Sequence, residues 1–474
     1  MTNTRRALVN KHFLVTIFIV YLSCTPPRSL LYLEGNPVLL NKINNIIESS
    51  GIDLNMGIKI VSLDNNKTLF AYNSQKLLMP ASTNKLYTCA AALHYLGNDY
   101  TFTTRVLKKK NNLVLKGGGD PDLKIDQLDS LAKIISKSVK KIDTLYIDDT
   151  FLDSLNYGEG WMWDEGPWWY AAPISALSVN DNCIDFYVEP GNIGSPANIN
   201  YFPETTYITF NNQSITVNDT LDFKKIKINR DWIANSNNFS VTGEIIDTTK
   251  RDTLYRNIYD PSLFTGTIFK LLLNEHGTIV KRLSKKTQDL TAYKEIAVHR
   301  SDSLIVSAKN LMNESDNLTA ELFVKSIGAL DTLPGTWEAG LDRVKSFLAE
   351  QVKIDTSNIR LADGSGVSRY TLTSSDQLIS LLSWMYKSKY KDDFISTLPG
   401  GGWPNSTLEK RLVEEGKLVR AKTGGLSGAR NLCGYIFSPR YGPVAFSIIM
   451  NGYIGSSSQH EYVQNQIVKA IIYD

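Results

Sequence analysis

Apolar and polar positions recur with two different periods along the chain, and the periods predict which segments are helices and which are strands. Residues 38–47 carry apolar side chains at helical spacing, and two short extended runs follow at 57–63 and 68–72. After Pro80 a second run with helical spacing continues to Gly97, a residue type that commonly ends a helix. The N-terminal part therefore predicts a helix, two strands and a further helix.

The same patterns predict helices and strands in the last third of the chain. These segments are residues 304–330, 336–351, 417–424, 431–437, 443–451 and 459–472. Taken with the N-terminal elements, the order is a helix, two strands, a helical block, three strands and a closing helix. That order predicts a mixed α/β fold in which one sheet gathers strands from both ends of the chain.

The middle of the chain differs in composition from both ends. Residues 99–291 are rich in Thr, Asn, Asp and Ile, with alternating runs such as 207–210 and 239–242 between frequent turn residues. Strict alternation with turn residues predicts strands. We therefore expect residues 99–291 to form a mainly β insertion between two parts of one domain, 37–98 and 292–474.

The N-terminus predicts an export signal over residues 1–24. Basic residues precede an apolar run at 13–22, which is about as long as a signal-peptide core and short for a membrane span. The run ends at Ser23-Cys24, which fits either lipoprotein cleavage, with Cys24 lipidated and anchored in a membrane, or plain cleavage near Ser23. Both alternatives predict an exported protein in the periplasm or on a periplasmic or outer-membrane face.

Composition and charge exclude several classes of function. An apolar share of 42%, a charged share of 21% and a formal charge of +3 over 474 residues are ordinary for a globular protein. Basic residues do not form a stripe with interleaved aromatics, so we expect no nucleic acid partner. No His, Cys and carboxylate group has metal-ligand spacing, and no cofactor is expected. The remaining cysteines, Cys89, Cys183 and Cys433, predict no disulfide.

Three short strings carry chemistry, in a fixed order. They are Ser82-Thr-Asn-Lys85, Ser315-Asp-Asn317 and Lys422-Thr-Gly424. Ser-x-x-Lys, Ser-Asp-Asn and Lys-Thr-Gly together are typical of penicillin-binding proteins and class A β-lactamases. Their contexts also fit one site: a helix start places Ser82 and Lys85 on one face, Ser315 lies at a helix corner, and Lys422 lies on a strand.

Each string alone has an ordinary structural explanation. Ser-x-x-Lys also occurs at Ser138 and Ser388, in Lys-rich stretches that read as exposed helix surface. Ser315-Asp-Asn317 could be a helix cap, and Lys422 could be a surface lysine before a turn. All three explanations would have to hold at once, in this order, for the chemical interpretation to fail.

With these strings the chain resembles the serine DD-carboxypeptidases and endopeptidases among the low-molecular-mass class C penicillin-binding proteins. Besides the strings, the similar stretches are 115–123, 172–177, 363–370 and 420–424, and the resemblance runs from about residue 37 to the C-terminus. It implies an α/β (α+β) penicillin-binding/serine β-lactamase-like transpeptidase fold with an insertion between the first two strings. It also implies peptidoglycan stem peptides as substrates and β-lactam antibiotics as acylating ligands.

The residues themselves predict part of the mechanism. A serine hydroxyl needs a base, no histidine lies near any string, and lysine can serve when burial lowers its pKa. Ser82 is thus the predicted nucleophile and Lys85 its base, while the resemblance implies the other roles. In that family Ser315 relays a proton, Asn317 holds the base and the substrate, and Thr423 and Lys422 bind the terminal carboxylate. The resemblance also implies that the Ser82 and Gly425 amides form the oxyanion hole.

One position departs from the family, and one segment has two interpretations. A threonine often follows Lys-Thr-Gly, but this chain has Gly425 and loses one hydroxyl, worth about 0.5–1.5 kcal/mol. This departure favours endopeptidase activity over carboxypeptidase activity, which needs a free carboxylate. The aromatic segment 161–170 either packs the insertion on the core or brings Asp164 or Glu165 to the amino end of a diaminopimelate side chain.

Two other functions remain open from the sequence. A β-lactamase-like hydrolase would need a deacylating carboxylate, which the sequence does not identify. A non-catalytic wall-binding or sensor protein would not need Ser82, Lys85, Ser315 and Lys422 intact.

Overall fold

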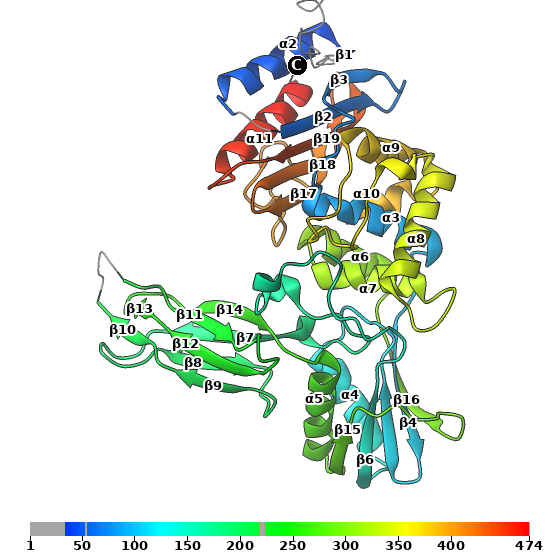
Figure 1. Cartoon of the computed structure of the whole chain (residues 1–474), viewed down its shortest axis with the longest axis vertical. Helices are drawn as coiled ribbons and strands as arrows, with labels where there is room; N and C mark the ends of the chain where they lie inside the picture. Colours follow the sequence, from blue (N-terminus) through cyan, green and yellow to red (C-terminus); the bar gives the residue numbers. More distant parts are fainter. Residues whose placement is uncertain (1–33, 53–54, 219–222, 474) are drawn as a thin grey trace, which may run out of the picture.

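The computed structural model describes residues 34–52, 55–218 and 223–473, and the predicted leader with Cys24 lies outside these ranges. One six-stranded sheet forms the centre of the upper part of the molecule in the view of Figure 1. Its order across the sheet is β1 (Glu34–Gly35), β3 (Thr68–Tyr72), β2 (Asn55–Ser62), β19 (Gly442–Asn451), β18 (Ala429–Ser438) and β17 (Val419–Leu426). As predicted, strands from both ends of the chain meet in this sheet, at β2 and β19.

Helices cover both faces of the six-stranded sheet, because its side chains alternate between two apolar cores. Leu432 and Ile436 of β18 face the core formed with α2 (Pro37–Ser49) and α11 (Ser458–Tyr473). Cys433 and Tyr435 face the other core, which is formed with a block of helices. The helices of that block are α3 (Lys85–Tyr95), α6 (Leu304–Asn313), α7 (Asn317–Gly328), α8 (Trp337–Phe347), α9 (Ser375–Lys387) and α10 (Lys391–Thr397).

The inserted segment first forms a five-stranded sheet with two helices. The sheet order is β15 (Ile279–Ser284), β6 (Lys141–Asp148), β5 (Asn112–Lys116), β4 (Thr103–Lys109) and β16 (Lys294–Arg300). Helices α4 (Ile125–Ser136) and α5 (Pro261–Glu275) pack on it and were not predicted. The predicted boundary at residue 291 is also wrong, because β16 hydrogen-bonds to β4 and so extends the inserted sheet to Arg300.

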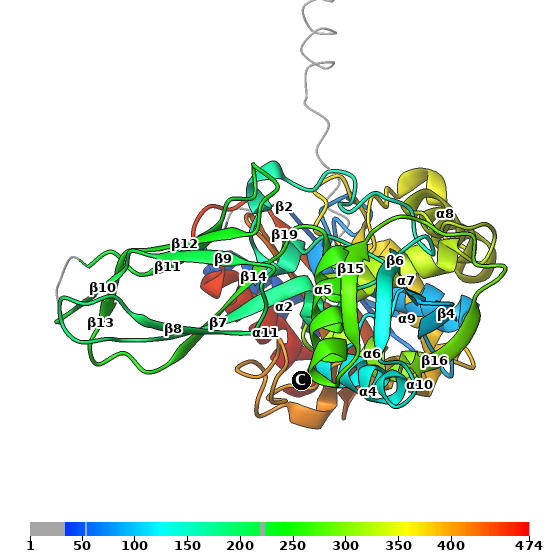
Figure 2. The same cartoon turned by 90° about the horizontal axis from the view of Figure 1, so that it is seen from below.

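A second group of short strands projects sideways from the inserted segment, as Figure 2 shows. It contains β7 (Cys183–Glu189), β8 (Asn198–Phe202), β9 (Thr209–Asn212), β10 (Ile215–Val217), β11 (Lys227–Arg230), β12 (Asn238–Thr242), β13 (Glu244–Ile246) and β14 (Asp252–Asn257). Phe186 and Phe239 from two of its sheets meet in one apolar core. The predicted β character of the insertion is thus confirmed for most of its elements.

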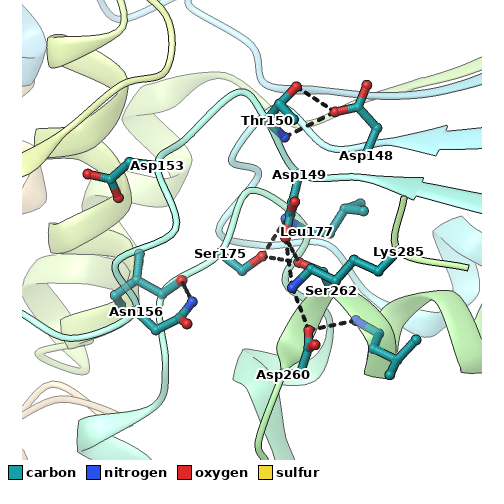
Figure 3. A network of polar contacts seen from close by, with 12 residues as sticks. Asp148, Asp149, Thr150, Asp153, Asn156, Ser175, Leu177, Asp260, Ser262 and Lys285 are labelled. Carbon is teal, nitrogen blue, oxygen red and sulfur yellow. Dashed lines mark hydrogen bonds and ion pairs between the residues drawn. The ribbon is translucent and has the colours of Figure 1, made fainter. Parts of the chain in front are cut away.

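A polar network fixes the segment that leads from the inserted sheet back to the helical block (Figure 3). Lys285 pairs with Asp149 at 3.1 Å and with Asp260 at 2.8 Å. Farther along the same segment, Asp153 accepts a hydrogen bond from the buried Lys325 of α7 at 2.6 Å. These ion pairs hold the residues that precede the aromatic segment 161–170 against both the inserted segment and the helical block.

The three cysteines of the described ranges are buried and form no disulfide. They are Cys89, Cys183 and Cys433. Burial raises the pKa of Cys89 and Cys433 to about 12, so both thiols stay protonated and pack as small apolar groups.

Candidate functional site

The first string begins a helix, as predicted, through a tight turn. Ser82 lies in the 3₁₀ turn η1 (Ala81–Asn84), and Lys85 is the first residue of α3. The residue before Ser82, Ala81, has a left-handed φ of 46°. Such strain is often held at functional sites by the surrounding structure.

The six-stranded sheet holds this turn in place. The amide of Asn431 on β18 donates to the carbonyls of Met79 at 3.0 Å and Pro80 at 2.6 Å. On β17, a side chain at Gly424 would come within 2.6 Å of the Pro80 carbonyl oxygen. The glycine of Lys-Thr-Gly therefore lets the turn pack directly on the strand, which brings Ser82 beside the sheet edge.

Lys85 is fully buried and joins the first two strings. Its Nζ lies 3.0 Å from Ser82 Oγ, 2.6 Å from Asn317 Oδ1 and 2.9 Å from the Ser365 carbonyl oxygen. Burial lowers the pKa of Lys85 to about 8, although the charges of Asp316, Glu321 and Asp363 oppose this shift. The amine is thus close to the serine and loses its proton at a much lower pH than an exposed lysine.

Two buried carboxyl groups stand behind Lys85. Glu321 of α7 accepts hydrogen bonds from the backbone amides of Gly364 and Ser365, both at 2.8 Å, and from Trp337 Nε1 at 2.7 Å. Asp363 accepts from the backbone amides of Gly366 at 2.9 Å and Ser368 at 2.7 Å. Together these carboxyls fix the loop whose Ser365 carbonyl accepts from Lys85.

Burial raises the pKa of both carboxyl groups. For Glu321 the value is about 7, because burial and the charge of Asp363 outweigh its hydrogen bonds. Burial likewise raises the pKa of Asp363. The charge that Glu321 places behind Lys85 therefore changes with pH near neutrality.

Ser315 and Lys422 form the second hydrogen-bonded group. Ser315 connects α6 and α7 with a left-handed φ of 67°, and its Oγ accepts a hydrogen bond from Lys422 Nζ at 2.8 Å. Next to Ser315, the side chain of Asp316 caps α7 through the amides of Leu318 and Thr319. The cap interpretation of the second string is thus correct for Asp316, while Ser315 and Asn317 turn toward lysines.

Lys422 is as buried as Lys85, but the charges that act on it most strongly are positive. Burial, followed by the charges of Lys85 and Arg430, lowers the pKa of Lys422 well below its usual value. Its Nζ donates to Ser315 Oγ and to the Thr423 carbonyl. An arriving anion would relieve this excess of positive charge.

Strand β17 forms an edge of the sheet, and its outward amides alternate. The amide of Ala421 donates outside the sheet, to the Pro399 carbonyl at 3.0 Å. In an antiparallel strand every second residue points its N–H to the same side. The Thr423 and Gly425 amides therefore also face outward, as an oxyanion hole and an added peptide strand require.

The aromatic segment 161–170 touches the site at two points. Trp161 Nε1 donates to Asp363 at 3.0 Å, and the Tyr170 carbonyl accepts from the Asn317 amide at 2.7 Å. Both sequence interpretations of the segment remain compatible with these contacts. Asp164 is exposed, whereas one Glu165 oxygen is buried with no partner among the described residues, and burial raises the pKa of Glu165.

Sequence reasoning missed the groups that lie behind the predicted residues. Glu321 was not predicted, although it is a charged residue within α7, a helix whose residues are all buried. A buried charge of this kind is a signal that a sequence can give, because such residues are rarely buried unpaired. The Ser365 and Tyr170 carbonyls gave no signal, since any residue type supplies a carbonyl.

Comparison with known proteins identifies the family. The chain matches the D-Ala-D-Ala carboxypeptidase 3 (S13) family over residues 39–471. It therefore belongs to that family of serine peptidases, and the predicted class of enzyme, a serine-type D-Ala-D-Ala carboxypeptidase of the penicillin-binding type, is confirmed.

Individual relatives agree with this assignment. The D-alanyl-D-alanine carboxypeptidase of Actinomadura sp. (strain R39) is 32% identical over 425 residues, which cover 84% of this chain and 78% of that protein. The crystal structure of penicillin-binding protein 4 from Haemophilus influenzae has a TM-score of 0.78 at 26% identity, covering 90% of this chain and 97% of that one. The same protein in complex with a β-lactam has a TM-score of 0.74, at 25% identity, covering 91% and 99% of the two chains. The predicted fold is thereby confirmed.

Proposed function

We propose that Ser82 is the nucleophile with which this enzyme cuts D-alanyl-D-alanine bonds in peptidoglycan stem peptides, as a carboxypeptidase, an endopeptidase or both. The observation that supports this most strongly is the buried Lys85 amine, 3.0 Å from Ser82 Oγ. With a pKa of about 8, this amine can accept the hydroxyl proton. Penicillins would acylate the same serine.

Acylation then proceeds by transfer of two protons. Ser82 Oγ attacks the carbonyl carbon between the two D-alanines while its proton passes to Lys85. When the C–N bond breaks, the leaving amine takes a proton from Ser315, which lies 2.8 Å from the Lys422 amine that can replace it. Water then attacks the ester carbonyl and passes a proton through Ser315 to Lys422, while Lys85 returns its proton to Ser82 Oγ as the ester bond breaks, so that both lysines and Ser82 are restored.

The charge that develops on the substrate oxygen needs two amide donors. The Ser82 amide, in the turn that leads into α3, and the outward-facing Gly425 amide supply them in this proposal. A donor of this kind typically contributes roughly 3–4 kcal/mol to the transition state. Asn317 would hold both Lys85 and the substrate backbone, and Thr423 would bind the terminal carboxylate beside Lys422.

The diaminopimelate side chain of the stem peptide is the proposed ligand of Asp164 or Glu165. Both lie in η2 (Trp163–Glu165), next to the Trp161 that donates to Asp363. The positive charge of Arg369 also acts on Glu165, which places this carboxyl near the loop that begins at Asp363. A free amino group on the substrate would therefore lie close to a carboxyl group at this edge of the site.

We also propose that the protein acts outside the cytoplasm, after export through the signal in residues 1–24. Lipidation of Cys24 and plain cleavage near Ser23 remain alternatives, and both sites lie outside the described residues. Within the ranges that the structure describes, no helix combines the length and apolar character needed to cross a bilayer.

Release of D-alanine from a synthetic peptide ending in D-Ala-D-Ala tests the proposed function. The purified enzyme should release D-alanine, and Ser82→Ala should abolish the release. Ser138→Ala and Ser388→Ala, which alter the other two Ser-x-x-Lys sequences, are matched controls and should leave the rate unchanged. Release by Ser82→Ala at the unaltered rate would contradict the proposal.

A further inference from the structure

An arginine on the neighbouring strand occupies the space of the side chain that Gly425 lacks. Gly425 of β17 is paired directly with Arg430 of β18. A Cβ atom at Gly425 would lie 2.6 Å from Arg430 Nη1, a distance that real Cβ atoms do not keep, so the guanidinium would have to shift. The Arg430 guanidinium therefore lies where a side chain at position 425 would begin.

Helix α11 holds this arginine in position. Arg430 Nη2 pairs with Glu461 Oε1 at 2.7 Å, and Ser457 Oγ donates to the same oxygen at 2.9 Å. The side chain of Gln464 donates to the Arg430 carbonyl at 2.9 Å. Because both its backbone and one arm of its guanidinium are fixed, Arg430 presents Nη1 in a defined direction.

The guanidinium has unused binding capacity. Its Nε is buried and has no hydrogen-bond partner among the residues that the structure describes. About a quarter of the side chain is exposed, at 25%. A guanidinium has five N–H donors in a planar fork that suits a carboxylate, so a ligand oxygen could be bound in addition to Glu461.

Arg430 also lies on the face of the sheet that Thr423 occupies. Side chains two residues apart on a strand share a face, so Thr423 and the absent side chain of Gly425 point the same way. Directly paired residues of neighbouring strands share a face as well. Arg430 is therefore next to the hydroxyl that is expected to bind the substrate carboxylate. Its charge also reaches Lys422, whose pKa it helps to lower after burial and Lys85.

We propose that Arg430 is a substrate-binding residue that, with Thr423, takes the C-terminal carboxylate of the peptide in place of a hydroxyl at position 425. This inference rests on the proposed function and adds to it the residue that selects substrates with a free carboxylate. It also changes the expectation from the sequence: the loss of a hydroxyl at Gly425 does not weaken carboxypeptidase activity, because a charged group replaces it.

The direct test compares two peptides that differ only at the C-terminus. The probes are an L-Lys-D-Ala-D-Ala peptide with a free carboxylate and the same peptide as its C-terminal amide. Arg430→Leu should lower kcat/KM for the free acid by roughly 10- to 100-fold, the value of a hydrogen bond to a charged group. For the amide the same change should be less than about threefold. Arg105→Leu, which removes another ion-paired arginine on β4, should alter neither.

A double variant separates carboxylate binding from a structural role. Gly425→Thr alone would push the Arg430 side chain aside, so we expect the preference for the free acid to fall. Gly425→Thr combined with Arg430→Ser provides hydroxyls without the collision, and should recover part of the preference lost in Arg430→Leu. Equal losses for both peptides in Arg430→Leu, or no loss for either, would overturn the inference.

A second pair of probes keeps the inference testable if the peptides are not cleaved. Absence of peptide cleavage together with rapid acylation by benzylpenicillin would contradict the peptidase activity and leave the Arg430 question intact. Acylation by benzylpenicillin and by its methyl ester, which lacks the carboxylate charge, would then be compared. Arg430→Leu should slow acylation by the free acid only, and an equal effect on both compounds would overturn the inference.

Discussion

Two fully buried lysines stand on opposite sides of the proposed site, and their surroundings differ in charge. Lys85, from the helical side, has the carboxyl groups of Asp316, Glu321 and Asp363 near it. Lys422, from the sheet side, is acted on by the positive charges of Lys85 and Arg430. Burial lowers the pKa of both amines, but carboxylates moderate the effect only at Lys85.

This difference fits two tasks in one reaction. A base must accept and return a proton near neutral pH, and the carboxylates keep the pKa of Lys85 at about 8 instead of letting burial lower it further. A site for a carboxylate must offer positive charge that nothing else neutralises. On the sheet side the positive charges of Lys85 and Arg430 act on Lys422, and Arg430 keeps its Nε unpaired among the described residues although its Nη2 pairs with Glu461.

Removal of the base should have the largest effect. Lys85→Met keeps an apolar stem of similar length but cannot accept the Ser82 proton, so kcat/KM should fall by roughly 10²- to 10⁴-fold for all substrates. Initial rates on the free-acid and amide peptides would measure this. Lys325→Met, which changes another buried lysine, is the matched control. It should retain most activity even if its melting temperature falls. Activity of Lys85→Met within tenfold of the parent would remove Lys85 as the base.

Removal of the opposite lysine should have a smaller and more selective effect. Lys422→Met should lower kcat/KM for the free-acid peptide by about 10²- to 10³-fold, as for other charge-stabilising groups. The loss for the amide should be smaller, because only the proton relay through Ser315 is then affected. Equal losses for both peptides would mean that the two sides of the site do not differ as proposed.

Neutralising the acids of the aromatic segment should affect one class of substrate only. Asp164→Asn with Glu165→Gln should lower kcat/KM about three- to tenfold for a peptide with a free diaminopimelate amino end, since exposed ion pairs are weak. The N-acetylated peptide should be unaffected. Glu159→Gln is the matched control, because Glu159 is exposed and pairs with Arg360 nearby. Unchanged hydrolysis of the free-amine peptide would leave only the packing interpretation of this segment.

The smallest expected change is a displacement of the pH profile. Activity should rise with pH as Lys85 loses its proton, with a limb near about 8 in the parent enzyme. The negative charge of Glu321 raises the pKa of Lys85, so Glu321→Gln should lower that pKa and move the limb to lower pH. Glu338→Gln, an exposed change on α8, should leave the profile in place. A limb that moves to higher pH would contradict the electrostatic role of Glu321.

Local patterns predicted the elements that carry the three strings, because two strings lie where a helix begins and the third lies within a strand that is followed by a turn. Ser82 precedes a helical run, and Lys422 lies on a strand that turns at Ser427–Gly428 before β18. Apart from the helix surface inferred around Ser138 and Ser388, the helices α4, α5, α9 and α10 were not predicted. The strand β16 was placed on the wrong side of the domain boundary, since only its pairing with β4 reveals where it belongs.

The groups behind the strings depend on contacts between distant segments, which a single sequence does not specify. Glu321 acts on the loop at 364–365 only because α7 packs against that loop. Arg430 lies beside Gly425 only in the register that pairs these two residues. A shift of β18 by one residue would turn the arginine to the other face of the sheet. The sequence shows that position 425 lacks a hydroxyl, but it does not show that Arg430 lies beside that position.

The most direct test of the central claim is to locate the acyl group. The enzyme would be incubated with benzylpenicillin, digested and analysed by mass spectrometry, with Ser82→Ala treated in parallel. We predict a covalent penicilloyl adduct on the peptide that contains Ser82, and none in the Ser82→Ala protein. An adduct on Ser138, Ser315 or Ser388, or no adduct in the unaltered enzyme, would contradict the account.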